Sequence, residues 1–124
     1  MAEPGASQST VEPQPACTLE ALTACYNAAQ TLPQTLDSAW LDNRIPVLLV
    51  DDGSTDDSAH YAAQREGVRV IRQRNAGPSV ARNRAILESR ATFVMFLDSD
   101  DVLRPGFRQA FEAALAAHPQ ADVF

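Results

Sequence analysis

Two short apolar runs constrain the fold of this chain more than any other feature of its sequence. Pro46–Val50 and Thr92–Leu97 contain no charged residue and are apolar almost throughout. Continuous runs of this kind are typical of strands in a parallel sheet that is covered by helices on both faces. Acidic residues end each run: Asp51 and Asp52 follow the first, and Asp98-Ser-Asp-Asp101 follows the second. We therefore predict two buried strands that carry carboxylates at their carboxyl ends.

Helix-like patterns alternate with strand-like runs along the chain. Leu32, Leu36 and Trp40 recur at i, i+4 and i+8, which marks the apolar face of a helix. The predicted strands are Thr18–Cys25, Pro46–Val50, Val68–Arg72 and Thr92–Leu97; the predicted helices are Gln30–Leu41, Asp56–Glu66, Pro78–Arg90 and one that Pro105 opens and Pro119 ends. This alternation predicts an α/β fold, a Rossmann-like parallel sheet with flanking helices, whose ligands bind beyond the carboxyl ends of the strands. Ala121–Phe124 could begin a fifth strand.

Composition and charge limit the possible functions. The net charge is −6, which argues against nonspecific binding of nucleic acid or anionic lipid. No apolar run approaches the roughly 20 residues of a membrane span, and the N-terminus lacks a signal-peptide pattern, so a cytoplasmic location is the default expectation. Residues 1–16 are rich in Pro, Ser, Gln and Glu and are predicted to be a disordered tail. Residues 17–124 are predicted to be one domain.

The two acidic clusters favour a metal site. If the two buried strands are neighbours, five carboxylates would crowd one rim of the sheet: Asp51, Asp52, Asp98, Asp100 and Asp101. Like charges a few Å apart repel by about 1 kcal/mol per pair in water and by more at lower dielectric. A hard divalent cation with oxygen ligands, Mg²⁺ or Mn²⁺, is the simplest relief and often bridges to substrate phosphates. The alternative is that these acids only form turns and caps.

Other residues near these strand ends could serve the structure of the protein or could bind a ligand. Ser54 or Thr55 is expected to cap the helix over Asp56–Glu66, with Asp56 and Asp57 as structural charges in its first turn. In Asn75–Asn83, a helix N-terminus could bind a phosphate and Arg82 could reach an anion, or the segment could be a simple Gly-Pro turn with a surface arginine. Tyr26, at the end of the first strand, could stack on a base or belong to the core.

Four segments, in this order, resemble the family 2 glycosyltransferases: Tyr26–Ala28, Val47–Asp56, Asn75–Asn83 and Phe96–Asp101. The resemblance covers about residues 18–124 and is specific because the four segments occur together with family-like gaps. It implies a GT-A fold and a nucleotide-diphospho-sugar donor, with UDP favoured.

The resemblance also implies roles for single residues. Tyr26 would pack against the base and Asp52 would hydrogen-bond it. Asp98 would hold the ribose, directly or through water, and Asp100 would ligate the Mn²⁺ or Mg²⁺ ion on the diphosphate. The predicted nucleotide-sugar site comprises Tyr26, Asp51, Asp52, Gly77, Arg82 and Asp98, with Asp100 as the metal ligand.

The reaction that the resemblance implies is an inverting transfer, in which a carboxylate base deprotonates an acceptor hydroxyl. That base is expected beyond residue 124, so residues 17–124 are predicted to be a partial domain, apparently truncated after about four to five strands. We expect donor and metal binding but little or no transfer by this chain alone. An exposed sheet edge would make self-association plausible.

Two other functions compete with this interpretation. Val47–Asp52 also resembles the start of a phospho-acceptor receiver domain, in which paired acids bind Mg²⁺; that family uses a lysine after its last strand, and this chain contains no lysine. The other alternative is a noncatalytic interaction domain that keeps the fold without turnover.

Overall fold

One parallel sheet organises the described part of the chain. The computed structural model describes residues 18–124, so the predicted tail over residues 1–16 lies outside the described residues. The strands are β2 (Leu19–Cys25), β3 (Val47–Asp51), β4 (Val68–Arg72) and β5 (Phe93–Phe96), and the helices are α1 (Leu32–Trp40), α2 (Ser58–Ala63), α3 (Pro78–Glu88) and α4 (Phe107–Ala117). Each pair of neighbouring strands is parallel. The predicted α/β architecture is confirmed.

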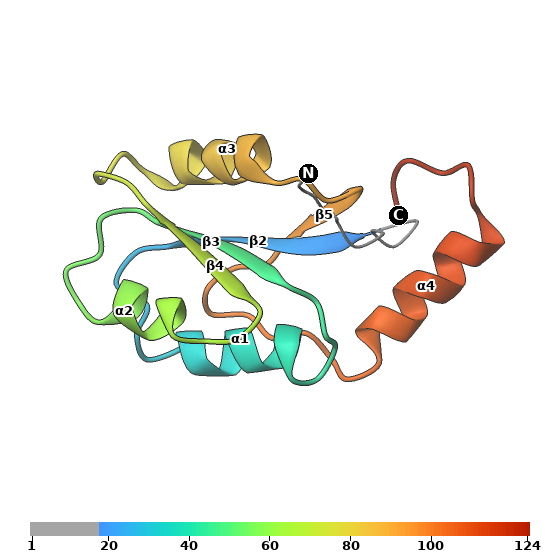
Figure 1. The fold of residues 1–124 in the computed structure, drawn as a ribbon, viewed down its shortest axis with the longest axis horizontal. Coiled ribbons are helices and arrows are strands. Elements are labelled where there is room, and N and C mark those ends of the chain that lie inside the picture. The colour runs from blue at the N-terminus through green and yellow to red at the C-terminus, as the bar shows by residue number, and fades with distance from the viewer. Residues whose placement is uncertain (1–17) are drawn as a thin grey trace, which may run out of the picture.

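The order of strands across the sheet is β4-β3-β2-β5, as Figure 1 shows. Counted along the described chain, this is third, second, first and fourth, the order of the dinucleotide-binding doubly wound sheets. Receiver domains have the order 2-1-3-4-5, so the receiver alternative is wrong. The order reverses between β2 and β5, and ligands of such sheets bind beyond the carboxyl ends of the strands at this reversal.

Helices cover the central strands on both faces. α3 lies on one face of the sheet, and α1 and α2 lie on the other (Figure 1). Side chains of β3 alternate between the two layers: Val47 and Leu49 pack on the α1 and α2 side, and Leu48 and Val50 pack beneath α3. All five residues of β3 are buried, which confirms the prediction drawn from its continuous apolar run.

β5 is less covered than its apolar sequence suggested. Val94 is 41% exposed and Phe96 is 51% exposed. β5 pairs only with β2 in the described sheet, and α3 packs over β2 and β3 instead. The exposed edge from which we predicted self-association is therefore present, and the association itself stays a prediction.

The C-terminal residues do not form the fifth strand that we considered. Residues 121–124 have no strand structure. Phe124 instead packs edge to face against Phe93 and Phe111, at centroid distances of 5.7 and 5.8 Å. This cluster links the chain end to β5 and α4.

α2 begins later than predicted, and its predicted cap is wrong. The helix starts at Ser58 with Asp57 at the N-cap position, and no side chain caps it. The Ser54 hydroxyl accepts a hydrogen bond from the Asn27 N–H at 2.8 Å instead. Ser54 therefore contacts the neighbouring loop instead of capping the helix.

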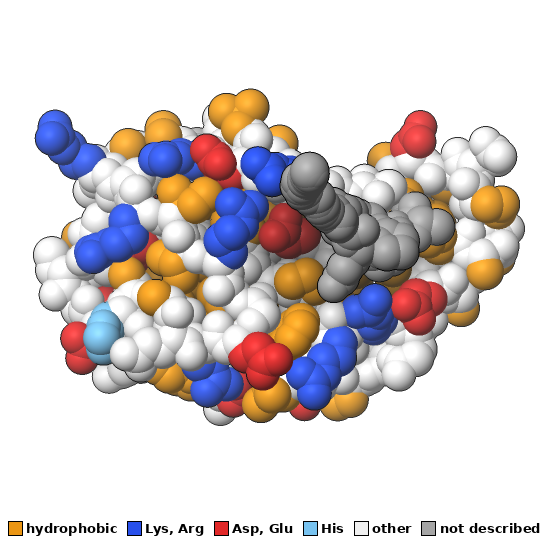
Figure 2. Space-filling view, in the orientation of Figure 1, with side chains coloured by type: hydrophobic (Ala, Val, Ile, Leu, Met, Phe, Trp, Pro, Cys, Tyr) orange, Lys and Arg blue, Asp and Glu red, His pale blue; other side chains and the backbone are white. Residues whose placement is uncertain are grey.

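Charged and apolar side chains are mixed over the face of the molecule in Figure 2. Several arginines lie together over the upper left of this view, and acidic and apolar side chains are scattered over the rest. Within residues 18–124, no helix is both long enough and apolar enough to cross a membrane.

Candidate functional site

Two adjoining hollows open at the carboxyl ends of the strands, each with a volume of about 390 Å³. Small-molecule sites usually have volumes of about 300–1,000 Å³. The apolar hollow is lined by Ala24, Cys25, Tyr26, Asp52, Asn75, Gly77 and Pro78. The acidic hollow is lined by Ala24, Tyr26, Asn27, Ala28, Thr31, Pro78, Arg82, Asp98, Ser99 and Asp100. Because Ala24, Tyr26 and Pro78 line both, the hollows form one continuous groove.

Tyr26 stands where the two hollows meet. It follows the last residue of β2 and is 52% exposed, so the interpretation of Tyr26 as a core residue is wrong. A half-exposed aromatic ring offers a large flat surface for packing at little cost in side-chain entropy. The ring is available to a planar ligand.

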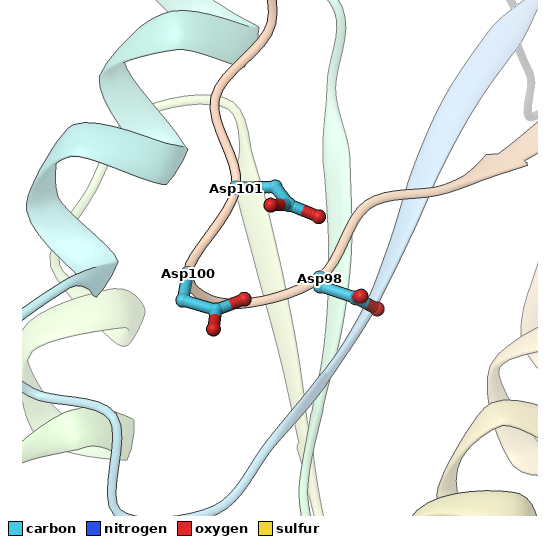
Figure 3. Close-up of side chains that lie close together, drawn as sticks. All are labelled: Asp98, Asp100 and Asp101. Atoms are coloured by element: carbon cyan, nitrogen blue, oxygen red, sulfur yellow. The ribbon is translucent and has the colours of Figure 1, made fainter.

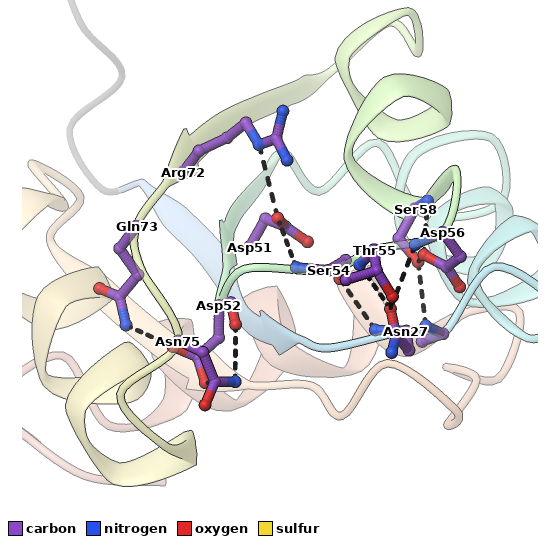
Figure 4. A network of polar contacts seen from close by, with 11 residues as sticks. Asn27, Asp51, Asp52, Ser54, Thr55, Asp56, Ser58, Arg72, Gln73 and Asn75 are labelled. Atoms are coloured by element: carbon purple, nitrogen blue, oxygen red, sulfur yellow. Dashed lines mark hydrogen bonds and ion pairs between the residues drawn. The ribbon is translucent and has the colours of Figure 1, made fainter.

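A network of polar contacts fixes the loop that carries Tyr26 (Figure 4). Asn27 adopts a left-handed backbone with φ of 51°, a conformation that asparagine tolerates better than most residues. Its Oδ1 accepts hydrogen bonds from the N–H groups of Thr55 at 2.8 Å and Asp56 at 3.2 Å. The loop after β2 is thereby tied to the loop after β3.

The next two residues of the same loop, Ala28 and Ala29, are hydrogen-bonded to side chains at the start of α2 and just before it. The Ala28 N–H donates to the Ser58 hydroxyl at 2.9 Å, and the Ala29 N–H donates to Asp56 Oδ2 at 3.2 Å. The Ser58 hydroxyl donates to Asp56 Oδ1 at 2.5 Å. Asp56, which we assigned to the first turn of α2, lies before that helix and links its first residue, Ser58, to the loop after β2. The hydrogen bond from the Ser58 hydroxyl is the main cause that lowers the pKa of Asp56, against the opposing effect of burial.

Replacing Asn27 by alanine is expected to lower the free energy of unfolding by about 2 kcal/mol, because the change removes two hydrogen bonds to backbone N–H groups and because alanine tolerates a left-handed backbone less well than asparagine does. Urea unfolding measures the effect. Asn27→Asp keeps the acceptor oxygen and should lose less than Asn27→Ala. Equal losses in the two variants would contradict the role of the Oδ1 acceptor.

Asp52 lines the apolar hollow, and its carboxylate is already engaged. Oδ1 accepts from Gln73 Nε2 and from the Ala76 N–H, each at 2.8 Å. Oδ2 accepts from the Gly77 N–H at 2.9 Å and from Asn75 Nδ2 at 3.2 Å. Burial alone would raise the pKa of Asp52, but the bonds from Gln73, Ala76 and Gly77 outweigh it and lower that pKa. Asp52 therefore holds the wall formed by residues 75–77.

Asp51 does not line either hollow. It is fully buried; Oδ2 accepts from the Ser54 N–H at 3.2 Å and lies 3.5 Å from Nε of Arg72. A carboxylate with no exposed surface is not available to a nucleotide, so the geometry does not support our assignment of Asp51 to the nucleotide site. Its contacts make it an internal support of the Asp51–Ser54 turn.

The two acidic clusters lie at the same edge of the sheet but are not neighbours, because β2 lies between β3 and β5. The crowding of five carboxylates that we considered does not occur. Asp51 is paired with Arg72, and Asp52 is surrounded by donors. The remaining carboxylates are all on the turn after β5.

That turn, Asp98–Asp101, is called the acidic turn below. The Asp101 N–H donates to the Asp98 carbonyl at 3.0 Å, which closes the turn. Its three carboxylates are exposed, and each offers one oxygen within 4.8 Å of the others; Figure 3 shows the three side chains on this short loop. Oxygen donors at this spacing suit a hard cation such as Mg²⁺ or Mn²⁺. The residues fit the predicted metal.

Arg82 faces the acidic turn from α3. Its Nη2 lies 3.8 Å from Asp98 Oδ1, and both side chains are largely exposed. Exposed pairs at this distance contribute little stability, so the guanidinium is free to turn to an anion in the acidic hollow. Gly77, at the start of α3, directs its N–H to Asp52, so its predicted contact with a phosphate would have to replace that bond.

Cys25 is buried and also lines the apolar hollow. Burial raises the pKa of its thiol, and the nearby Asp51 carboxylate raises it further, against hydrogen bonds from Ser58 and Ser54. The neutral thiol is unreactive. The sequence analysis gave no individual role to several residues of the groove, namely Asn27, Thr31, Asn75, Pro78 and Ser99. All of them except Thr31 lie within the four segments that resemble the family.

The family model described as "Glycosyl transferase family 2" matches residues 21–124. This chain belongs to glycosyl transferase family 2. The resemblance proposed from four sequence segments is therefore confirmed, and it extends through the groove residues that the structure brings together.

Curated relatives of this family 2 chain include two succinoglycan biosynthesis proteins of Rhizobium meliloti (strain 1021). ExoU is 42% identical over 86 residues, which cover 64% of this chain and 25% of ExoU. ExoO is 37% identical over 106 residues, which cover 81% of this chain and 30% of ExoO. The chain thus spans between a quarter and a third of the length of these relatives.

Solved structures confirm the GT-A fold. The structure of S. aureus TarS 1-349 in complex with UDP-GlcNAc has a TM-score of 0.72 at 24% identity, over 82% of this chain and 32% of that one. The Mycobacterium tuberculosis glucosyl-3-phosphoglycerate synthase, in complex with uridine diphosphate, has a TM-score of 0.63 at 25% identity, over 74% and 37% of the two chains.

Proposed function

We propose that this family 2 chain binds the nucleotide-diphospho-sugar donor of a glycosyltransferase, with a UDP-sugar favoured. One observation carries the proposal: Tyr26 joins an apolar hollow to an acidic hollow that contains Arg82, Asp98 and Asp100. A nucleoside diphosphate has the same division, with a flat base at one end and charged phosphates at the other. The UDP-GlcNAc and UDP complexes of the two solved structures agree with it.

The apolar hollow would hold the base. Tyr26 would pack on one side of it, and Pro78 and Gly77 border the other part of the hollow. Asp52 already accepts four hydrogen bonds, so a base N–H would have to share one of its oxygens. We therefore assign Asp52 two roles. It shapes the wall of the apolar hollow, and it offers a buried hydrogen-bond acceptor to the base.

The acidic hollow would hold the diphosphate and its metal. Asp100 would ligate Mn²⁺ or Mg²⁺, and Asp98 would hold the ribose. Arg82 would contact a phosphate, because guanidinium groups match phosphate oxygens. The metal, when bound, would stabilise the negative charge that develops on the departing nucleoside diphosphate.

We propose that the whole enzyme inverts the configuration of the transferred sugar. This inverting transfer requires a carboxylate base for the acceptor hydroxyl, and we assign no such base among residues 18–124. Donor binding is the activity that we propose for the described residues. The noncatalytic interaction domain differs from it in having no metal-dependent nucleotide binding.

Titration calorimetry of the chain with UDP tests the proposal. We expect Mn²⁺ to strengthen UDP binding by about tenfold or more, an increase that EDTA reverses and Asp100→Ala removes, because a single charged ligand contact contributes about 1.5–3 kcal/mol. Asp42→Ala, which removes an exposed carboxylate at the far end of α1, is the matched control and should bind as the unchanged chain does.

Two results would contradict the proposal. Asp100→Ala with an undiminished response to Mn²⁺ would show that the metal site lies elsewhere. A folded chain that binds neither UDP nor GDP would make the interaction domain the better account.

A further inference from the structure

The acidic turn is held at its middle by two hydroxyl groups, one from α1 and one from Thr31, the residue before that helix. The Ser99 carbonyl accepts hydrogen bonds from Thr31 Oγ1 at 2.9 Å and from Thr35 Oγ1 at 3.0 Å. Each hydroxyl also has an acceptor within its own segment, but at the longer distance of 3.3 Å. A carbonyl oxygen has two lone pairs, so the two threonines satisfy it completely.

The Ser99 carbonyl belongs to the one peptide group whose rotation changes the type of the turn. In a four-residue turn, the peptide between the second and third residues has opposite orientations in types I and II. The type II orientation requires a positive φ at the third residue, which is Asp100 here. Within residues 18–124, Asn27 and Arg44 are the non-glycine residues with positive φ, so Asp100 is not in that form.

The sequence of the turn does not exclude the flipped form by itself. Aspartate tolerates a left-handed backbone better than most residues do. Rotation of the Ser99–Asp100 peptide would redirect the Asp100 side chain relative to Asp98. The hydrogen bonds from the two threonine hydroxyls oppose that rotation, because it would turn the carbonyl away from both of them.

α1 is a firm support for these bonds. Thr35 is fully buried and lines neither hollow, so any effect of Thr35 on a ligand is indirect, and the shorter of its two hydroxyl contacts is to Ser99. Further along α1, the Ser38 hydroxyl accepts from the Leu103 N–H at 3.0 Å. After α1, Asn43 Oδ1 accepts from the Arg108 N–H at 3.0 Å. The segment that follows β5 is thus anchored to α1 and the loop after it.

We propose that Thr31 and Thr35 are positioning residues, which fix the Ser99–Asp100 peptide and so orient the carboxylates of Asp98 and Asp100 toward metal and diphosphate. This inference rests on the proposed donor site. It assigns the threonines no contact with the metal, and their influence is exerted through the backbone of the acidic turn.

The test compares the unchanged chain with Thr35→Val, Thr31→Val/Thr35→Val and Thr35→Ser. Valine keeps the shape of threonine and removes the hydroxyl, whereas serine keeps the hydroxyl. Two quantities are measured: the exchange rate of the Asp101 amide by NMR without any ligand, and the increase in UDP affinity on addition of Mn²⁺ by calorimetry.

We expect the Asp101 amide to exchange faster in both valine variants, because the turn closed by that amide loses its support. The Mn²⁺-dependent increase in UDP affinity should fall by about tenfold in the double variant and by less in Thr35→Val, since each hydrogen bond contributes about 0.5–1.5 kcal/mol. Thr35→Ser should behave as the unchanged chain in both measurements. Binding of uridine, which has no diphosphate, should not change in any variant.

Failure of this inference and failure of the donor site give different results. If the unchanged chain responds to Mn²⁺ and the double variant responds equally, or if Thr35→Ser loses as much as Thr35→Val, the positioning role is overturned alone. If the unchanged chain shows no response to Mn²⁺, the donor site is overturned and the positioning role with it. If the Asp101 amide exchanges at the same rate in the double variant as in the unchanged chain, the claim that the two threonines stabilise the acidic turn would be overturned.

Discussion

Replacing Asp52 by asparagine is expected to lower the free energy of unfolding by about 2–4 kcal/mol and to weaken UDP binding by roughly a hundredfold. The Asp52 carboxylate is buried and accepts hydrogen bonds from four donors. Bonds to a charged acceptor are stronger than neutral ones. Asparagine has the same shape but loses the charge and turns an NH₂ group toward at least one of those donors.

The effect on binding follows from the effect on the wall of the groove. Without the bonds that the Ala76 and Gly77 N–H groups donate to Asp52, residues 75–77 would no longer be held beside Tyr26. Urea unfolding and calorimetry with UDP measure the two losses. Asp57→Asn is the matched control, because Asp57 is exposed in the same loop and its side chain does not cap α2.

The Asp52 carboxylate should also give the chain a specific dependence on pH. Its pKa is lowered in the folded state, so its contribution to stability is present above the unfolded pKa of about 3.9 and is lost as the pH falls through the folded pKa. The difference in stability between the unchanged chain and Asp52→Asn should therefore shrink below about pH 4. A difference that stays constant down to pH 2 would contradict the role of the charge.

Replacing Gly67 by alanine is expected to cost about 2–4 kcal/mol of stability. Gly67 has φ of +80°, and a β-carbon there would overlap the indole ring of Trp40. The Gly67 carbonyl accepts from the Val47 N–H at 2.8 Å, so the backbone cannot move away without loosening the start of β3. Thermal or urea unfolding measures the cost.

Gly106→Ala separates the two causes of this cost. Gly106 has φ of +87°, but no atom lies within 4 Å of its would-be β-carbon. The control should therefore lose only the roughly 1 kcal/mol of a left-handed residue. Equal losses at the two positions would show that contact with Trp40 is unimportant.

Much of the fold was readable from the sequence because its signals are local and redundant. The apolar run before Asp51 predicted a fully buried strand, and the stripe of Leu32, Leu36 and Trp40 predicted α1. The strand order could not be read in this way, since it depends on which strands pair across the sheet. The pattern therefore left open whether the two acidic clusters meet, and the insertion of β2 between β3 and β5 separates them.

The site prediction was also limited because contacts between segments distant in the sequence cannot be read from local patterns. Asp98, Asp100, Arg82 and Tyr26 lie together around one groove, as expected from strand ends in a parallel sheet. Asp51 and Asp52 are adjacent in sequence, yet alternation along the strand sends one into the interior and the other to the groove. Ser54 was misassigned because a capping pattern cannot show that its hydroxyl binds a loop from another strand, and the same pattern cannot show that Asp56 also binds that loop.

A crystal structure of the chain with UDP and Mn²⁺ is the most direct test of the donor site. Data collected near the manganese absorption edge locate the ion without assumptions about its ligands. The account predicts an anomalous peak beside the Asp100 carboxylate, with the uracil ring against Tyr26 and the diphosphate between them. A manganese ion bound away from the acidic turn, or a nucleotide bound outside the groove that Tyr26 divides, would contradict it.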